Sequence, residues 1–285
     1  MKVTTEPTEW RAWLDQARQD GKQVGLHLTM GALHAGHAAN IRRAAGECDV
    51  VAVTIFVNPL QFGPHEDFAA YPRDLAADLA RAEVAGADIV LAPETTAIYP
   101  DEPLVTVRVK QLADILEGRH RPGHFDGVAT VVTKFLALSG PCRTYFGEKD
   151  YQQLVIVRRL VSDLSLPVEV VACPIVREED GLALSSRNAY LGPAGRVAAR
   201  ALYWSLLAGK RAVEEQGATD PGTVRAAMLE VAGGEELFDL DYAEAVDAVT
   251  LEVPPVLSGE ARLLIAGRVG KARLIDNVPA NAVEG

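Results

Sequence analysis

The 285-residue chain lacks an uninterrupted apolar run of about 18 residues, and its first residues are polar. It therefore predicts neither a membrane-spanning helix nor a signal peptide. Only three cysteines occur, Cys48, Cys142 and Cys173, and none forms a CxxC pair. An odd, scattered set argues against a disulfide framework or a zinc site. We expect reduced, buried thiols and a cytoplasmic protein.

Positive charge is also scarce, with 28 Lys and Arg against 39 Asp and Glu and a formal net charge of −11. Without a cluster of basic side chains, nucleic acid is an unfavourable partner. The overall charge repels small anions as well, so a bound anion would need donors arranged around it. Hydrophobic residues make up 48% of the chain and charged residues 24%, as in ordinary globular proteins.

Short Val- and Ile-rich runs alternate with helical patterns over the first 175 residues. The predicted strands are residues 24–29, 50–57, 87–92, 104–109, 143–146 and 168–173. The predicted helices are residues 8–20, 72–85, 127–139 and 149–164, with Pro72 in the first turn of the second. Continuous apolar strands separated by helices indicate an α/β fold, a doubly wound, Rossmann-like and mostly parallel sheet.

The pattern changes after Pro174. Apolar residues recur at helical spacing at Val197, Ala201, Trp204 and Ala208. A second helix is predicted from Asp220-Pro221 to Gly233-Gly234, followed by a hairpin of residues 261–266 and 272–275. We therefore expect residues 1–176 to form the Rossmann-like domain and residues 177–285 a smaller α+β domain.

The most informative segment is TMGALHAGH at residues 29–37, which follows a predicted buried strand. A strand end, a small-residue turn and a helix start offer free backbone N–H groups and the positive end of a helix dipole to an anion. His34 and His37 add two side-chain donors, so the segment predicts phosphate chemistry. Walker and dinucleotide-binding patterns do not match. A metal site formed by His34 and His37 would lack a third ligand at helical spacing nearby. A purely structural role of the two histidines stays open.

Two amides, Asn58 and Gln61, stand in an otherwise apolar segment after the second predicted strand. Turn formation explains Asn58 before Pro59. Gln61 needs a partner if it is buried, and a ligand hydroxyl or carboxylate could be that partner.

Three further segments carry candidate groups. Residues 118–125 are basic. They form either a solvated surface loop or a region of positive charge that attracts an anion. Lys149 opens a predicted helix against the dipole preference, which indicates an anion in front of it, and Asp150 could hold a divalent cation. Ser185, Ser186 and Arg187 would form a phosphate clamp, although serine-rich loops are common.

Together these segments resemble the pantothenate synthetase (pantoate–β-alanine ligase) family of the HIGH-motif nucleotidylyltransferase superfamily. The similarity rests on TMGALHAGH at 29–37, IFVNPLQFGPHEDFAAYPRD at 55–74, EGRHRPGHFDGVATVVTKF at 117–135, YFGEKDYQQLVIVRRLVSDL at 145–164, IVREEDGLALSSRNAYL at 175–191 and RLIDN at 273–277. It implies that (R)-pantoate reacts with ATP to give pantoyl adenylate and diphosphate, and that β-alanine then displaces AMP. It further implies Mg²⁺ and a homodimer formed through the larger domain.

The resemblance also implies roles for individual residues. His34 and His37 would bind phosphate and stabilise the transition state, with His37 as proton donor. Lys149 would neutralise phosphate charge, and Arg187 would close over the phosphates. Pantoate and β-alanine would contact Asn58, Gln61 and Gln153, and Asp150 would lie near magnesium. The implied ATP site comprises Met30, Gly31, Ala32, Leu33, His34, Ala35, Gly36, His37, Gly147, Glu148, Lys149, Asp150, Val176, Leu184, Ser185, Ser186 and Arg187.

Two positions depart from the family pattern. Leu28 replaces a proline before the Thr-Met pair, and Ala35 replaces a glutamate at a position that should face solvent. Neither is a proposed catalytic group. Two other functions stay open: a nucleotidylyltransferase that stops at a nucleotide-linked product, and a regulatory module that only binds nucleotide.

Overall fold

The computed structural model describes residues 1–64, 66 and 68–282, and these form two compact units. The first, the N-terminal unit, consists of Met1–Glu148 and Gln153–Ile175. The second, the C-terminal unit, combines the short segment Lys149–Gln152 with the chain from Val176 onward. No helix of the described residues is long and apolar enough to cross a membrane.

The N-terminal unit is built on a parallel sheet with the strand order β1-β4-β3-β2-β5-β6. Its strands are β1 (Lys2–Thr4), β2 (Val24–Thr29), β3 (Val50–Ile55), β4 (Ile89–Leu91), β5 (Cys142–Gly147) and β6 (Val168–Cys173). The Val-rich β3 is buried along most of its length, as expected for a strand covered on both faces of the sheet. The predicted Rossmann-like fold is confirmed.

The helix α3 (Leu75–Ala85) begins and ends at recognisable capping residues. The Asp74 carboxylate accepts a hydrogen bond from the Ala77 N–H at the start of α3, and Gly86 ends that helix with a φ of 102°. The α-helices are α1 (Pro7–Gln19), α2 (Ala35–Glu47), α3 (Leu75–Ala85), α4 (Thr95–Ile98), α5 (Leu116–His120), α6 (His124–Ser139) and α7 (Tyr151–Asp163), whose first two residues belong to the C-terminal unit. Two 3-10 helices, η1 (Pro59–Gln61) and η2 (Glu148–Asp150), follow β3 and β5.

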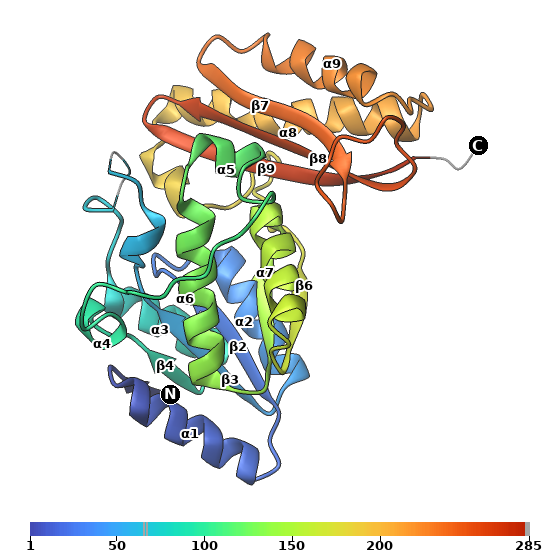
Figure 1. Cartoon of the computed structure of the whole chain (residues 1–285). Helices are drawn as coiled ribbons and strands as arrows, with labels where there is room; N and C mark the ends of the chain where they lie inside the picture. The colour runs from blue at the N-terminus through green and yellow to red at the C-terminus, as the bar shows by residue number, and fades with distance from the viewer. Residues whose placement is uncertain (65, 67, 283–285) are drawn as a thin grey trace. The chain divides into compact units, whose positions relative to one another are not determined.

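Helices cover both faces of the parallel sheet (Figure 1). On one face, Ile41 of α2 and Ala82 of α3 join Val51 and Val53 of β3 in one buried cluster. On the other face α1 packs against α6, which runs along the near side of the strands in Figure 1. Because both faces are covered, only the loops at the ends of the strands remain to form a binding site.

The strand order reverses beside β2, since β3 lies on one side of it and β5 on the other. The connections after β2, β3 and β5 therefore leave the same edge of the sheet, at the carboxyl ends of neighbouring strands. Ligands of open α/β sheets bind outside this edge at the point of reversal. The TMGALHAGH segment starts there.

The predicted strand at residues 104–109 is wrong. Leu104 and Val105 are 98% and 87% exposed. The Val107 N–H donates to Thr130 Oγ1 and the Val109 N–H donates to Asp126 Oδ1, at 3.0 and 2.8 Å. Both acceptors are side chains of α6, so the segment is bonded to a helix and not to another strand.

Two details of the predicted helices also change. α3 begins at Leu75, so Pro72 is not in its first turn. Val197 and Trp204 lie on the predicted helix but are 60% and 44% exposed, because that helix buries the neighbouring stripe that includes Leu206. β1 and a strand from Phe238 were not predicted at all.

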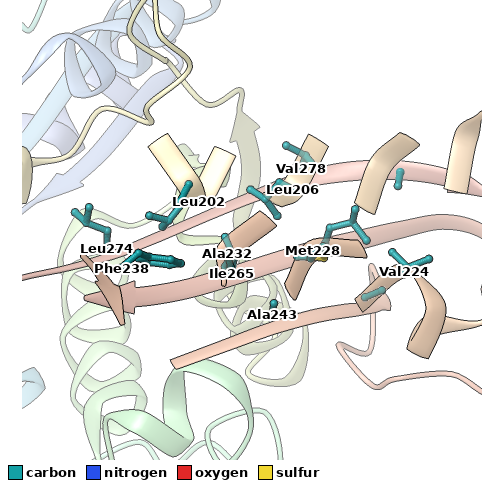
Figure 2. Close-up of a cluster of buried hydrophobic side chains, with 14 of the residues drawn as sticks. Leu202, Leu206, Val224, Met228, Ala232, Phe238, Ala243, Ile265, Leu274 and Val278 are labelled. Carbon is teal, nitrogen blue, oxygen red and sulfur yellow. The ribbon is translucent and has the colours of Figure 1, made fainter. Parts of the chain in front are cut away.

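The C-terminal unit is α+β, as predicted. The helices α8 (Pro193–Glu214) and α9 (Pro221–Ala232) pack against an antiparallel sheet of β7 (Phe238–Asp247), β8 (Gly259–Val269) and β9 (Ala272–Ala282). Figure 2 shows Leu206 of α8 and Met228 of α9 among the side chains of this core, with Ile265 and Val278 of the sheet. The predicted hairpin is confirmed, with Gly270 in its turn at a φ of 58°.

The helix α6 approaches η1 more closely than a side chain would allow. A Cβ atom on Gly127 would lie 2.2 Å from the Leu60 carbonyl oxygen and 2.7 Å from Gln61 Cα. The Gly127 carbonyl oxygen also accepts a hydrogen bond from Asn58 Nδ2 at 3.1 Å. The glycine therefore determines where the Asn58–Gln61 segment lies.

We expect Gly127→Ala to destabilise the protein by about 1–3 kcal/mol, because the added methyl group must displace η1. Gly46→Ala is the matched control, since Gly46 lies in α2 and a Cβ atom there would meet nothing within 4 Å. That change should stabilise by about 0.5–1 kcal/mol, because alanine loses less backbone entropy in a helix. Urea unfolding of both variants measures the difference, and equal effects would contradict the close approach.

Candidate active site

The two histidines of the TMGALHAGH segment cap the helix that follows them. His34 is the N-cap of α2, and its Nδ1 accepts a hydrogen bond from the Gly36 N–H at 3.1 Å. His37 Nδ1 accepts a hydrogen bond from the His34 N–H at 3.3 Å. The ring centroids lie 4.1 Å apart. Both imidazoles thus have a structural role, and the start of the helix holds them side by side.

These bonds also assign the ring protons. A nitrogen that accepts a hydrogen bond uses its lone pair, so a neutral imidazole then carries its proton on the other nitrogen. With Nδ1 as acceptor in both rings, His34 and His37 each carry the proton on Nε2. Two neighbouring Nε2–H donors are suited to oxygen atoms on which negative charge develops.

The backbone of the turn before these histidines differs from the prediction of free amides. The N–H groups of Ala32 and Leu33 donate to the two carboxylate oxygens of Asp78, at 2.9 and 2.7 Å. The Gly31 N–H donates to Thr29 Oγ1 at 3.2 Å. The ring nitrogens of His37 and His34 bind two further amides of the segment, the N–H groups of His34 and Gly36. The prediction is therefore wrong for these five amides, because side chains already bind them.

Asp78 is the main residue that the sequence analysis missed. Its side chain is 1% exposed and reaches the turn from α3. From the same helix, Arg81 Nη1 donates to the Leu33 carbonyl oxygen at 2.7 Å. Two side chains of α3 thus hold Leu33 through its N–H and its carbonyl. The available signal was an aspartate inside an apolar helix, since a buried carboxylate must find donors.

His27 of β2 lies next to the histidine pair, with its ring centroid 5.9 Å from that of His37. Its Nδ1–H donates to the Tyr145 carbonyl oxygen on β5 at 2.8 Å. Burial lowers the pKa of His27 to about 4, so this ring is neutral at neutral pH. Among the residues that the structure describes, its Nε2 has no hydrogen-bond partner.

Gln61 is buried and lies beside Met30. Its Oε1 accepts a hydrogen bond from Asn58 Nδ2 at 3.1 Å, and its Nε2 lies 2.9 Å from Met30 Sδ. Asn58 Oδ1 accepts from the Leu60 N–H and from the Tyr99 hydroxyl, at 3.3 and 3.0 Å. Turn formation therefore does explain Asn58, and the loops after β2 and β3 meet at Gln61.

The basic segment at residues 118–125 supports η1. Arg121 binds both carboxylate oxygens of Glu66, at 2.8 and 2.5 Å. His124 Nδ1–H donates to the Gln61 carbonyl oxygen at 2.9 Å. Burial, and secondly the charge of Arg121, lowers the pKa of His124 to about 4. Since Glu66 compensates the charge of Arg121, this part of the segment has a structural role and not that of a solvated loop.

In the C-terminal unit, Lys149 and Asp150 form an ion pair with 3.4 Å between Nζ and Oδ1. No group of three or more metal-ligating side chains occurs in the part of the chain that the structure describes. Asp150 is half-exposed and would supply a single carboxylate. This suits Mg²⁺, which commonly binds proteins through one or two carboxylates and keeps water and phosphate as its other ligands.

The remaining candidates of this unit form one small substructure. The Leu184 N–H donates to the Val176 carbonyl oxygen at 3.0 Å, and an antiparallel bridge joins Arg177 to Ala183. Ser185 follows directly and caps the 3-10 helix η3 (Ser186–Tyr190). Val176, Leu184 and the Ser185–Arg187 segment are therefore brought together.

The candidate residues divide between the two units. The N-terminal unit carries Met30–His37, Asn58, Gln61, Gly147, Glu148 and Gln153, and the C-terminal unit carries Lys149, Asp150, Val176 and Leu184–Arg187. Leu28 is part of β2 in register with Thr54 of β3. Ala35 is exposed, as expected for this departure from the family pattern.

We expect Asp78→Asn to destabilise the protein by about 1–3 kcal/mol, because the new amide group cannot accept hydrogen bonds with both of its atoms. The turn would lose one of its two bonds at Ala32 and Leu33, so nucleotide binding should weaken as well. Denaturant unfolding and ATP titration measure the two effects. Glu83→Gln is the control on the same helix, because that side chain is 62% exposed. An Asp78 variant as stable as this control would contradict the role of the carboxylate.

Known proteins share this sequence and fold. The family model for pantoate–β-alanine ligase matches residues 2–279. The pantothenate synthetase of Deinococcus radiodurans is 51% identical over 263 residues, which cover 90% of this chain and 93% of that protein. The crystal structure of the Thermus thermophilus pantothenate synthetase matches with a TM-score of 0.93 and 46% identity, over 98% of this chain and 99% of the other.

A more distant ligase, from Francisella tularensis, was crystallised in complex with β-γ ATP and β-alanine. It matches with a TM-score of 0.80 and 33% identity, over 98% of this chain and 97% of that chain. Both the sequence match and the fold extend over nearly the whole chain. The chain therefore belongs to the pantoate–β-alanine ligase family.

Proposed function

We propose that this enzyme condenses (R)-pantoate with β-alanine to pantothenate, with ATP as co-substrate and AMP and diphosphate as products. First, a carboxylate oxygen of pantoate attacks the α-phosphorus of ATP and diphosphate leaves. The amine of β-alanine then attacks the acyl carbon and AMP leaves. The observation that carries the proposal is the family match over residues 2–279, combined with an intact HxGH pair held as two donors.

His34 and His37 would donate hydrogen bonds from Nε2 to oxygen atoms of the ATP phosphates. Their orientation is set before the substrate arrives, because the Nδ1 atoms are bound to the start of α2. Donors that need no reorganisation are the ones that lower a barrier most. His37 would also donate a hydrogen bond from Nε2 to an oxygen of the departing diphosphate.

Gln61 and Gln153 would hold pantoate through its hydroxyl groups and carboxylate, and Gln61 would also lie near β-alanine. Support comes from Gln61, whose amide is fixed by Asn58 and lies against Met30 of the TMGALHAGH segment. Holding the carboxylate close to the phosphate turns a reaction between two molecules into one within a complex.

Lys149 and Arg187 would neutralise charge on the phosphates, while Ser185 and Ser186 would bind the β- and γ-phosphates. Met30–His37, Gly147–Asp150, Val176 and Leu184 would line the ATP site. Asp150 would hold Mg²⁺, which neutralises phosphate charge when bound. We further propose that the C-terminal unit acts as a lid that keeps water from the reactive adenylate.

Two broader features complete the proposal. By analogy with the family, the enzyme would be a homodimer formed through the N-terminal unit. A cytoplasmic location is supported by the three cysteines, which form no disulfide. Burial raises the pKa of the Cys142 thiol to about 12, so this side chain stays protonated and unreactive.

We expect release of AMP only when pantoate, β-alanine and ATP are all present, measured in a coupled assay that omits each substrate in turn. Exchange of diphosphate into ATP should need pantoate but not β-alanine, because it reports the first half-reaction alone. Turnover that is indifferent to β-alanine would favour a nucleotidylyltransferase. ATP binding in calorimetry without any turnover would favour a regulatory module.

We expect His37→Ala to lower the rate of adenylation by about 10²-fold or more, through loss of a donor to the developing phosphate charge. The variant also loses a helix cap, so Asp220→Ala serves as a control that removes the cap of α9 instead. Pantoate-dependent exchange and melting temperature are measured for both. Near-normal exchange in the His37 variant would remove this side chain from the mechanism.

A further inference from the structure

The RLIDN segment at residues 273–277 matches the family pattern but has no part in the function proposed above. It lies in β9, where successive side chains point to opposite faces of the sheet. Asp276 and Asn277 are both buried, at 3% and 1% exposure. Two adjacent buried polar residues on a strand need partners on both faces, and these partners show what the segment does.

Asn277 binds the backbone of Lys149. Its Nδ2 donates to the Lys149 carbonyl oxygen at 2.9 Å, and its Oδ1 accepts from Arg262 Nε at 2.7 Å. The amide is thus used at both ends, and Arg262 fixes its orientation. The contact spans 128 positions of the sequence, so it is a feature of the tertiary fold.

The residues after Lys149 are bound to the same unit. The Arg262 guanidinium carbon lies 4.0 Å from the centroid of the Tyr151 ring, and the Tyr151 hydroxyl donates to the Ala248 carbonyl oxygen at 2.9 Å. These contacts bind the Lys149–Gln152 segment to the C-terminal unit. Lys149 is therefore held by the C-terminal sheet, although it follows a strand of the parallel sheet directly in the sequence.

Asp276 holds the second candidate segment of this unit. Its carboxylate binds Arg177 through both oxygens, at 2.6 and 3.0 Å, and Arg177 also donates to the Asn277 carbonyl oxygen at 3.1 Å. Arg177 is bridged to Ala183, two residues before Ser185. Neighbouring residues of one strand thus fix Lys149 and the substructure that carries Ser185–Arg187.

We propose that Asn277 is a positioning residue for Lys149: its hold on the Lys149 carbonyl sets the place from which the ammonium group reaches the nucleotide phosphates. The inference rests on the role of Lys149 in the proposed function. Asn277 touches no substrate itself. Because a displacement of about 1 Å can cost about 10²-fold in rate, loss of this one hydrogen bond is sufficient to affect adenylation.

A double-mutant cycle of Asn277→Ala and Lys149→Ala tests the proposal. It measures kcat and KM for ATP in pantoate-dependent diphosphate exchange, and the dissociation constant of ATP by calorimetry. We expect Asn277→Ala to lower kcat/KM for ATP by about 10²-fold in the parent protein. In the Lys149→Ala background the same change should have almost no further effect, because the side chain it positions is gone.

If diphosphate exchange by the variants that carry Lys149→Ala falls below detection, the dissociation constants of ATP from calorimetry complete the cycle. Asn277→Asp is a second variant for the case that alanine prevents folding. It keeps the acceptor for Arg262 and replaces the donor to Lys149 with a carboxylate oxygen that repels the Lys149 carbonyl oxygen. Asn281→Ala is the control for a change on the same strand. Its exposed side chain should be dispensable, with kcat/KM unchanged.

The outcomes separate the inference from the proposed function. Equal losses from Asn277→Ala in both backgrounds would show a general structural effect and overturn the positioning role alone. Wild-type kinetics in a folded Asn277 variant would overturn it as well. Near-normal exchange and ATP affinity in Lys149→Ala would overturn both the role of the lysine and this inference.

Discussion

The hydrogen bonds from Ala32 and Leu33 to the Asp78 carboxylate determine the form of the turn that carries the candidate residues after β2. A turn between a buried strand and a helix leaves consecutive N–H groups away from water, and each costs about 1–3 kcal/mol when it has no partner. In many nucleotide-binding proteins the phosphate of the ligand binds such groups. Here a side chain binds them, so the turn keeps its shape without a ligand. The imidazoles of His34 and His37 remain as the donors that our proposal assigns to phosphate.

The same two histidines link the stability of α2 to the proposed chemistry. Nδ1 of each ring is committed to the start of the helix, and this leaves the proton on Nε2. In the neutral form of each ring this Nε2–H can donate to a phosphate oxygen. The structural and the chemical explanation of the HxGH pair are therefore compatible.

Local patterns in the sequence predicted the parallel sheet, most helices and the C-terminal hairpin, because these depend on hydrophobic periodicity and on residues such as Gly86 and Asp220. They failed where a partner lies far away in the sequence. The segment 104–109 has the composition of a strand, but its N–H groups bind Asp126 and Thr130 of α6. Asp78 was missed for the same reason, since its partners are more than 40 positions away. The proposed roles of the site residues came from resemblance and not from such patterns.

The strength of ion pairing distinguishes the basic side chains of the candidate segments. Arg177 is bound by both oxygens of Asp276, whose side chain alone is 2% exposed, and Arg121 is bound by both oxygens of Glu66. Breaking such enclosed pairs leaves an uncompensated charge and is strongly destabilising.

Lys149 instead pairs with a single oxygen of Asp150 at 3.4 Å; the Asp150 side chain is 51% exposed and that of Lys149 is 19% exposed. This pairing agrees with our proposal that Lys149 binds phosphate, whereas Arg121 and Arg177 are each held by both oxygens of a carboxylate. In the sequence all three are simply basic residues within family motifs, and only their partners in the structure show that Arg121 and Arg177 support the fold.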